Sequence, residues 1–326
     1  MSWKRRPSWA ATGGERIADV KRPSYRDLLD SGVLRERVDL ALSLLESCRL
    51  CPRKCAVNRL SGETGFCRTG RHAAVAAFHA HFGEESPLVG RGGSGTIFIT
   101  HCNLRCSFCQ NFEISHGGEG VPTGPGRLAD MMLRLQEAGC HNINFVSPSH
   151  VVPQLLEALV PAAEKGLAVP LVYNSGGYDL PETLKILDGV FDIYMPDFKF
   201  WDAGRSKRLC DAGDYRERAV AAVREMHRQV GDLVISPEGV AERGLLVRHL
   251  VMPEGTDDTE KIAIFLSREI SRNTYVNIMD QYRPCGNAFA EPDINRRVTG
   301  REYGEAVRLA LRAGLTRLDK PLRFPG

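Results

Sequence analysis

Apolar and polar residues follow a regular rhythm along most of this chain. From residue 95 onward, short apolar runs alternate with longer stretches whose apolar residues recur at helical spacing. The expected strands cover residues 95–100, 142–147, 170–174, 191–196, 245–252 and 275–279. The expected helices cover residues 127–138, 152–165, 181–187, 214–230 and 257–272. Strands and helices that alternate in this way predict βα units around a parallel sheet.

Units of this kind fit an α/β fold, a partial (β/α)6 TIM-like barrel, whose reacting groups lie at the carboxyl ends of the strands. A doubly wound open sheet is the alternative, which is weakened because no expected strand is followed by a G-x-G-x-x-G turn. Leucines at helical spacing predict a further helix over residues 31–46, after an arginine-rich arm expected to wrap on the body. We therefore expect an arm and helix (1–47), a cysteine-rich metal-binding extension (48–75) and a barrel with a C-terminal helix (76–326).

Three cysteines follow the first expected strand in the pattern C-x3-C-x2-C, namely Cys102, Cys106 and Cys109. Three thiolates at this spacing can hold three irons of a [4Fe-4S] cluster and leave the fourth iron open to a substrate. A zinc site with His101 as its fourth ligand is an alternative, but structural zinc typically uses two C-x2–4-C pairs. A disulfide is disfavoured because we see no secretory signal. We refer to these three residues as the barrel cysteines.

A second group of cysteines lies upstream, and we call it the N-terminal quartet: Cys48, Cys51, Cys55 and Cys67. Four thiolates within one short loop suit either a structural zinc or a second iron–sulfur cluster. The spacing slightly favours an iron–sulfur cluster, because the three-residue gap between Cys51 and Cys55 is less usual in zinc knuckles. A vestigial site that binds no metal is a third alternative. The isolated Cys140 and Cys210 are expected to be small buried residues, and Cys285 is a candidate reactive thiol.

Polar residues gather where the expected strands end, as a barrel active site requires. They are Ser147, Ser149, Asn174, Ser175, Asp197, Lys199 and Arg248. Asp197 and Lys199 share one face of their strand, and two opposite charges at an apolar strand mouth are unusual unless they are paired. On the last strand, the alternating residues Asn277, Met279 and Gln281 are expected to floor a substrate pocket, whereas His249 faces the other way and is expected to be structural.

The cysteine loop resembles that of the radical S-adenosylmethionine (SAM) enzymes. Together with 47–55, 195–199, 248–253 and 277–284, it resembles an uncharacterised iron–sulfur family similar to the pyruvate formate-lyase activating enzyme. The resemblance implies that the open iron chelates the amino and carboxylate groups of SAM. It also implies reductive cleavage to methionine and a 5′-deoxyadenosyl radical, which takes hydrogen from a substrate. That substrate would be a glycine of a glycyl radical enzyme, another protein residue or a small molecule.

The same resemblance implies roles for individual residues. Phe108 would lie against the adenine of SAM, with an ordinary core position as the alternative. Ser147, Ser149, Asn174, Lys199 and Arg248 would hold SAM, and Arg248 suits a carboxylate because its guanidinium is a planar bidentate donor. Asn174, Ser175, the Met195 carbonyl and Asp197 would gather a monovalent cation beside SAM, although Asn174 replaces an acidic residue of those enzymes. A reduced flavodoxin or ferredoxin would supply the electron.

Net charge and hydropathy limit the kinds of partner that this protein is expected to bind. The formal net charge of +3 over 326 residues is too small to argue for nucleic acid. No stretch approaches the ~18 apolar residues of a membrane span, so we expect no membrane and a cytoplasmic protein. Two other classes stay open: an electron carrier with two clusters, which leaves the polar strand ends unexplained, and a zinc-binding module.

Overall fold

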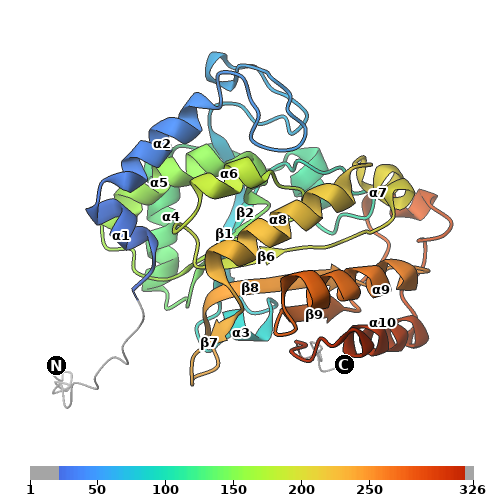
Figure 1. The fold of residues 1–326 in the computed structure, drawn as a ribbon. Helices are drawn as coiled ribbons and strands as arrows, with labels where there is room; N and C mark the ends of the chain where they lie inside the picture. The colour runs from blue at the N-terminus through green and yellow to red at the C-terminus, as the bar shows by residue number, and fades with distance from the viewer. Residues whose placement is uncertain (1–21, 320–326) are drawn as a thin grey trace, which may run out of the picture.

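A sheet of nine strands forms the centre of the computed structural model, which describes residues 22–319 (Figure 1). Six of them run parallel and neighbour one another in chain order: β2 (Ser94–Ile99), β4 (Ile143–Val146), β5 (Leu171–Ser175), β6 (Ile193–Pro196), β8 (Ala241–Leu250) and β9 (Tyr275–Met279). Neighbours in chain order are typical of a barrel, whereas a doubly wound sheet reverses direction at a switch point. The expected partial barrel is therefore confirmed.

Helices cover the outside of these strands. Those expected between strands are α4 (Pro125–Glu137), α5 (Val152–Glu164), α6 (Pro181–Ile186), α8 (Tyr215–Val230) and α9 (Thr256–Phe265), the last continued by η4 (Leu266–Ile270). The remaining helices are α1 (Tyr25–Asp30), α2 (Val33–Ser43), α3 (Ser86–Val89), α7 (Ala203–Cys210) and α10 (Gly300–Ala313), with short turns η1 (Arg59–Ser61), η2 (Glu113–Gly117), η3 (Pro148–His150) and η5 (Gly286–Ala290). The C-terminal helix α10 packs on α9 and begins with a capping box between Thr299 and Glu302.

Three strands were not predicted from the sequence: β1 (Ala73–His81), β3 (Val121–Thr123) and β7 (Val234–Ile235). β1 pairs antiparallel with β2 and carries β3 on its other edge, so the sheet extends beyond the parallel strands. Its sequence is rich in alanine and histidine, which have little β-propensity, and pairing with β2 overrides this. Because β1 begins at Ala73, it crosses the boundary expected after residue 75.

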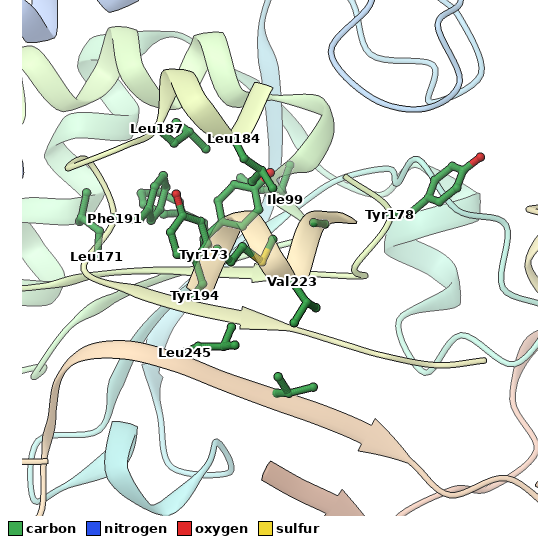
Figure 2. Close-up of a cluster of buried hydrophobic side chains, with 14 of the residues drawn as sticks. Ile99, Leu171, Tyr173, Tyr178, Leu184, Leu187, Phe191, Tyr194, Val223 and Leu245 are labelled. Atoms are coloured by element: carbon green, nitrogen blue, oxygen red, sulfur yellow. The ribbon is translucent and has the colours of Figure 1, made fainter. Parts of the chain in front are cut away.

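The two faces of the parallel strands have different environments, because side chains alternate along a strand. Outward residues pack beneath the helices, and Figure 2 shows Tyr173, Phe191 and Tyr194 between the strands and Leu184 of α6. The three aromatic rings lie 5.0–6.1 Å apart between centroids, and two of the three pairs meet edge to face. Residues near the amino ends of the strands, Val172 and Ile193 among them, belong to a separate apolar cluster that also includes Leu88 of α3.

The N-terminal segment lies against the outside of the barrel. Helices α1 and α2 pack on α5, and both the amide and the hydroxyl of Ser24 donate to the carboxylate of Asp192. Residues 22–30 thus wrap on the body as expected, whereas the rest of the predicted arm, 1–21, lies outside the described residues. The cysteine-rich segment follows α2 as a loop at the top of Figure 1. Within residues 22–319, no helix has the length and apolarity that a bilayer crossing demands.

Replacing Phe191 by alanine tests the outer core. Phe191 is 3 % exposed and contacts Tyr173 and Tyr194, so its loss removes apolar burial and leaves a cavity. We expect the free energy of unfolding to fall by ~3–5 kcal/mol. Chemical denaturation should measure this, with Phe289→Ala as the matched control, because Phe289 is 63 % exposed and should change stability by less than about 0.5 kcal/mol. Equal effects of the two substitutions would contradict this description of the core.

Candidate active site

A cavity of about 390 Å³ opens at the carboxyl ends of the parallel strands. The predicted site residues that line it are Cys102, Cys106, Cys109, Phe108, Ser147, Asn174, Ser175, Asp197, Lys199 and Arg248. The expected floor residues Asn277, Met279 and Gln281 line it too. Residues scattered over the chain thus meet in one space, where side chains from several strand ends can act on one substrate.

The barrel cysteines are held by the turn that follows β2. The Cys109 sulfur accepts a hydrogen bond from the Ser115 hydroxyl at 3.1 Å, and the Cys102 sulfur accepts one from the Leu104 amide at 3.4 Å. Burial raises the pKa of the Cys102 thiol to about 12, so an iron that binds there must displace the proton. His101 is not among the described residues that line the cavity, which removes the support for a zinc site with His101 as the fourth ligand.

Cys210 lies beside the barrel cysteines, which the sequence did not indicate. It is fully buried, as expected, but its sulfur lies 3.2 Å from that of Cys106. The carbonyl groups that end α7 accept from the amides of Arg105 and Ser107, so α7 holds the cysteine loop in place. Cys210 packs behind Cys106 and is not one of the cavity-lining residues, so its thiol does not face the substrate side.

Asp197, Lys199 and Arg248 form a mostly buried ion network across the ends of β6 and β8, with side chains that are 13–17 % exposed. The Arg248 Nε donates to Asp197 Oδ1 at 2.9 Å, and the Lys199 ammonium donates to Asp197 Oδ2. Although burial by itself would raise the pKa of Asp197, the charges of Arg248 and Lys199 outweigh it and lower that pKa. The same network raises the pKa of both basic groups despite their burial, so all three are charged at neutral pH.

The ion network involves two of the residues expected to gather a monovalent cation. Arg248 Nη2 donates to Asn174 Oδ1 at 2.7 Å, and both carboxylate oxygens of Asp197 accept from Arg248 and Lys199. The side-chain oxygens of Asn174 and Asp197 thus accept from side-chain cations of the protein. A monovalent cation at this position stays a prediction.

Ser149 and Ser175, both expected to take part in binding SAM or a cation, make hydrogen bonds within the protein. Ser149 is buried and is not among the described cavity-lining residues, and the hydroxyl of Ser175 donates to Asp179 at 2.7 Å. Burial raises the pKa of Asp179, and the hydroxyls of Ser149, Ser175 and Tyr173 partly offset the effect. The expected contact of Ser149 with SAM is thus corrected, because the left-handed backbone of Ser147 (φ 61°) starts the turn η3, which places Ser149 beside Asp179. Ser147 itself stays at the cavity wall.

Phe108 lies at the cavity wall, whereas His249 lies on the outer face of its strand. Phe108 is 4 % exposed and packs against Phe200 and Tyr282, yet it also lines the cavity, so it is both core and wall. His249 faces outward, where its ring nitrogens lie 2.8 Å from the Phe198 carbonyl oxygen and 2.8 Å from the Thr259 hydroxyl. The structural role expected for His249 is confirmed.

Sequence reasoning missed two acidic residues of the cavity wall, Glu84 and Glu85, here called the glutamate pair. They lie between β1 and β2, in a segment that reaches across to β9, where Asn277 Nδ2 donates to Glu85 Oε1 at 3.0 Å. Burial raises the pKa of both groups, that of Glu85 to about 7, although Arg248 opposes the effect. Two adjacent glutamates after an unrecognised strand were the available signal, but only the pairing of β1 with β2 brings them inside the barrel.

All four side chains of the N-terminal quartet line one small pocket, together with the buried Arg59 and His150. The Cys55 sulfur accepts from the Phe66 amide at 3.3 Å, and Arg59 Nη1 lies 3.9 Å from the Cys48 sulfur. Burial raises the pKa of the Cys51 thiol to about 12, and the other three sulfurs add to the shift. The four thiols thus line one pocket, but no group of three or more His, Cys, Asp or Glu side chains among residues 22–319 is arranged to hold a metal ion, so zinc or an iron–sulfur cluster at the quartet stays a prediction.

Arginines join the two cysteine groups. Arg53 donates to the Asn103 carbonyl oxygen at 2.9 Å and stacks on Phe66, with 3.7 Å between its guanidinium carbon and the ring centroid. Arg105 donates to the Phe66 carbonyl oxygen at 3.1 Å. Asn103 and Arg105 lie inside the loop of the barrel cysteines, and Phe66 precedes Cys67. The N-terminal quartet is thus fixed directly against the barrel cysteine loop.

Comparison with known proteins identifies the class to which this fold and site belong. The sequence profile of the radical SAM superfamily matches residues 96–266, about half of the chain. An uncharacterized protein of Methanocaldococcus jannaschii, MJ0674, is 35% identical over 302 residues, which cover 90% of this chain and 83% of that protein. A second protein of that organism, uncharacterized MJ0808, is 26% identical over 182 residues, 51% of this chain and 52% of its own length. The chain belongs to the radical SAM superfamily.

Two solved structures resemble the fold. They are HydG, a maturase of the [FeFe]-hydrogenase (TM-score 0.48, 13% identity), and SuiB of Streptococcus suis (TM-score 0.45, 12% identity). The matches cover 69% and 68% of this chain but 50% and 47% of those chains. This chain therefore spans about half the length of either structure.

Cysteine substitutions test which thiols bind iron in the barrel. We expect Cys106→Ala to lose the iron of the barrel cysteines, because a [4Fe-4S] cluster needs all three thiolates here. Cys210→Ala is the matched control, since Cys210 touches Cys106 from behind, and it should keep the wild-type iron content. Iron and sulfide analysis of anaerobically reconstituted protein measures both. A loss of iron from Cys210→Ala equal to that from Cys106→Ala would show a fourth protein ligand and contradict the open iron.

Proposed function

We propose that this protein is a radical SAM enzyme that takes a hydrogen atom from a C–H bond of a substrate bound inside the barrel. The observation that carries the proposal is the single cavity shared by the barrel cysteines and the charged strand ends. A carrier that only passes electrons has no use for such a cavity. The glycyl radical activase role is a narrower form of the proposal, supported by the sequence motifs alone.

The residues present fit the cofactors of the superfamily. The barrel cysteines supply three thiolates, with hydrogen bonds to two of their sulfurs, as iron–sulfur ligands commonly have. When bound, the [4Fe-4S] cluster supplies the electron that cleaves SAM to methionine and the 5′-deoxyadenosyl radical. The protein contributes orientation, charge and exclusion of water.

The ion network orders the charges along the cavity. The charge of Lys199 partly opposes the raised pKa of the three barrel cysteines, whose largest cause is burial in Cys102 and Cys109 and the contact with Cys210 in Cys106. We therefore place the Lys199 ammonium on the cysteine side of Asp197. Arg248 lies on the other side of Asp197, towards the glutamate pair. We assign Lys199 to the carboxylate of SAM, Phe108 to its adenine and Arg248 to the boundary between SAM and substrate.

The N-terminal quartet holds a second metal centre in this proposal. An iron–sulfur cluster is favoured over zinc because Arg53 and Arg105 fix the quartet against the barrel cysteine loop, which is where an electron relay is useful. A reduced flavodoxin or ferredoxin would dock on this side and pass its electron through the quartet. This route differs from activating enzymes with extra clusters after the radical SAM loop, because residues 112–126 contain no cysteine.

Product analysis tests SAM cleavage. Anaerobically reconstituted wild-type protein, reduced with dithionite, should convert SAM to equal amounts of 5′-deoxyadenosine and methionine, and Cys106→Ala should form neither. Cys140→Ala is the matched control because Cys140 is a buried cysteine away from the cavity, and it should keep the wild-type yield. Wild-type protein that holds the cluster and binds SAM without forming 5′-deoxyadenosine would refute the proposal.

Metal analysis of Cys51→Ala tests the quartet separately. The variant should lose iron relative to wild type and still cleave SAM with dithionite, since dithionite reduces the barrel cluster directly. Its cleavage driven by reduced flavodoxin should fall at least about tenfold, because the relay is gone. A loss of zinc with no change in iron would instead identify the quartet as a structural zinc site and remove the relay.

A further inference from the structure

The cavity holds more carboxyl groups than side-chain cations. Its inner wall holds three carboxylates, Asp197 and the glutamate pair, against the two cations Lys199 and Arg248. Asp197 accepts from both cations within hydrogen-bond distance, whereas each glutamate lies 3.9 Å from Arg248. The glutamate pair therefore shares what remains of one guanidinium, and because burial raises the pKa of both carboxyl groups, the pair is only partly ionised at neutral pH unless a further cation binds beside it.

The same wall carries a carboxylate oxygen without a partner among the described residues. Glu85 is 4 % exposed, and its Oε2 accepts no hydrogen bond from any described residue. A buried carboxylate oxygen without a hydrogen-bond donor is unfavourable, so the Glu85 Oε2 atom favours a ligand that donates to it.

Position separates this wall from the part of the cavity assigned to SAM. Lys199 and Arg248 both donate to Asp197, and Arg248 lies 3.9 Å from each glutamate. Glu85 also accepts from Asn277 of β9, so the glutamate pair lies on the side of Arg248 away from Lys199. A molecule held there faces SAM across the cavity, which is where a substrate must be.

We propose that the glutamate pair, with Asn277, binds the cationic group of the substrate, an ammonium or guanidinium, and that the substrate is an organic cation. The substrate role rests on the proposed radical SAM function. An ammonium offers three N–H donors and a guanidinium five, which suit the free acceptor of Glu85, and either places a positive charge beside the two carboxyl groups, which favours their ionised form. A backbone glycine carries no charge, so this subsite favours a small amine or a lysine or arginine side chain over glycine activation.

The probes that test the subsite are n-butylammonium and its neutral isostere n-butanol. Isothermal titration calorimetry on reconstituted protein with SAM should detect binding of n-butylammonium and no binding of n-butanol. Glu85→Gln should lower the affinity for n-butylammonium at least about tenfold, since it removes one of the two carboxylates that face the ligand and keeps the shape of the side chain. Glu84→Gln should have the same effect. Glu137→Gln, an exposed position on α4, is the matched control and should leave the affinity unchanged.

The outcomes separate this inference from the function on which it rests. Equal binding of the two probes, unchanged affinity in both glutamate variants, or displacement of n-butylammonium by equimolar potassium ion would overturn the subsite. The yield of 5′-deoxyadenosine without a probe is measured in parallel on wild-type protein. If 5′-deoxyadenosine forms but n-butylammonium does not bind, the proposed function holds and the proposed subsite is wrong. If n-butylammonium binds but no 5′-deoxyadenosine forms, the subsite holds and the proposed function is wrong.

Discussion

The mostly buried ion network of Asp197, Lys199 and Arg248 is the interaction on which the rest of the site depends. Asp197 and Arg248 face each other where β6 ends against β8, and the Phe198 amide donates to the Arg248 carbonyl oxygen at 2.8 Å. Removing one member of a buried ion pair typically costs about 3–5 kcal/mol, because its partner is left charged and desolvated. The network thus holds two strands in register and divides the cavity into a cysteine side and a glutamate side.

The division gives each part of the cavity its own charge. On the cysteine side, Lys199 faces thiols that burial alone would keep protonated, so a positive charge favours their binding to metal. On the glutamate side, the segment between β1 and β2 brings two carboxylates into the cavity wall. The N-terminal quartet lies outside this space, fixed by Arg53 and Arg105 to the cysteine loop. In the function we propose, electron entry and substrate binding would therefore occupy different parts of the molecule.

The sequence was sufficient to predict those features that depend on residues close together in the chain. Hydrophobic periodicity placed the parallel strands and the helices between them, and the cysteine spacing indicated two loops as candidate metal sites. It failed where the outcome depends on contacts between distant segments. β1 is a strand because β2 pairs with it, Cys210 touches Cys106 because α7 ends there, and the glutamate pair enters the cavity through its contact with Asn277. The side-chain oxygens of Asn174 and Asp197, expected to bind a cation, accept from Arg248, a contact that the sequence did not predict.

The most direct test of the central claim, that the barrel cysteines leave one iron open for SAM, is electron paramagnetic resonance and electron–nuclear double resonance of the reduced cluster. Addition of SAM should change the spectrum, and SAM labelled with ¹⁷O in its carboxylate should show hyperfine coupling to the cluster. The Cys51→Ala variant allows the barrel cluster to be measured without a signal from the quartet. A spectrum that does not change with SAM, and a label without coupling, would contradict the account.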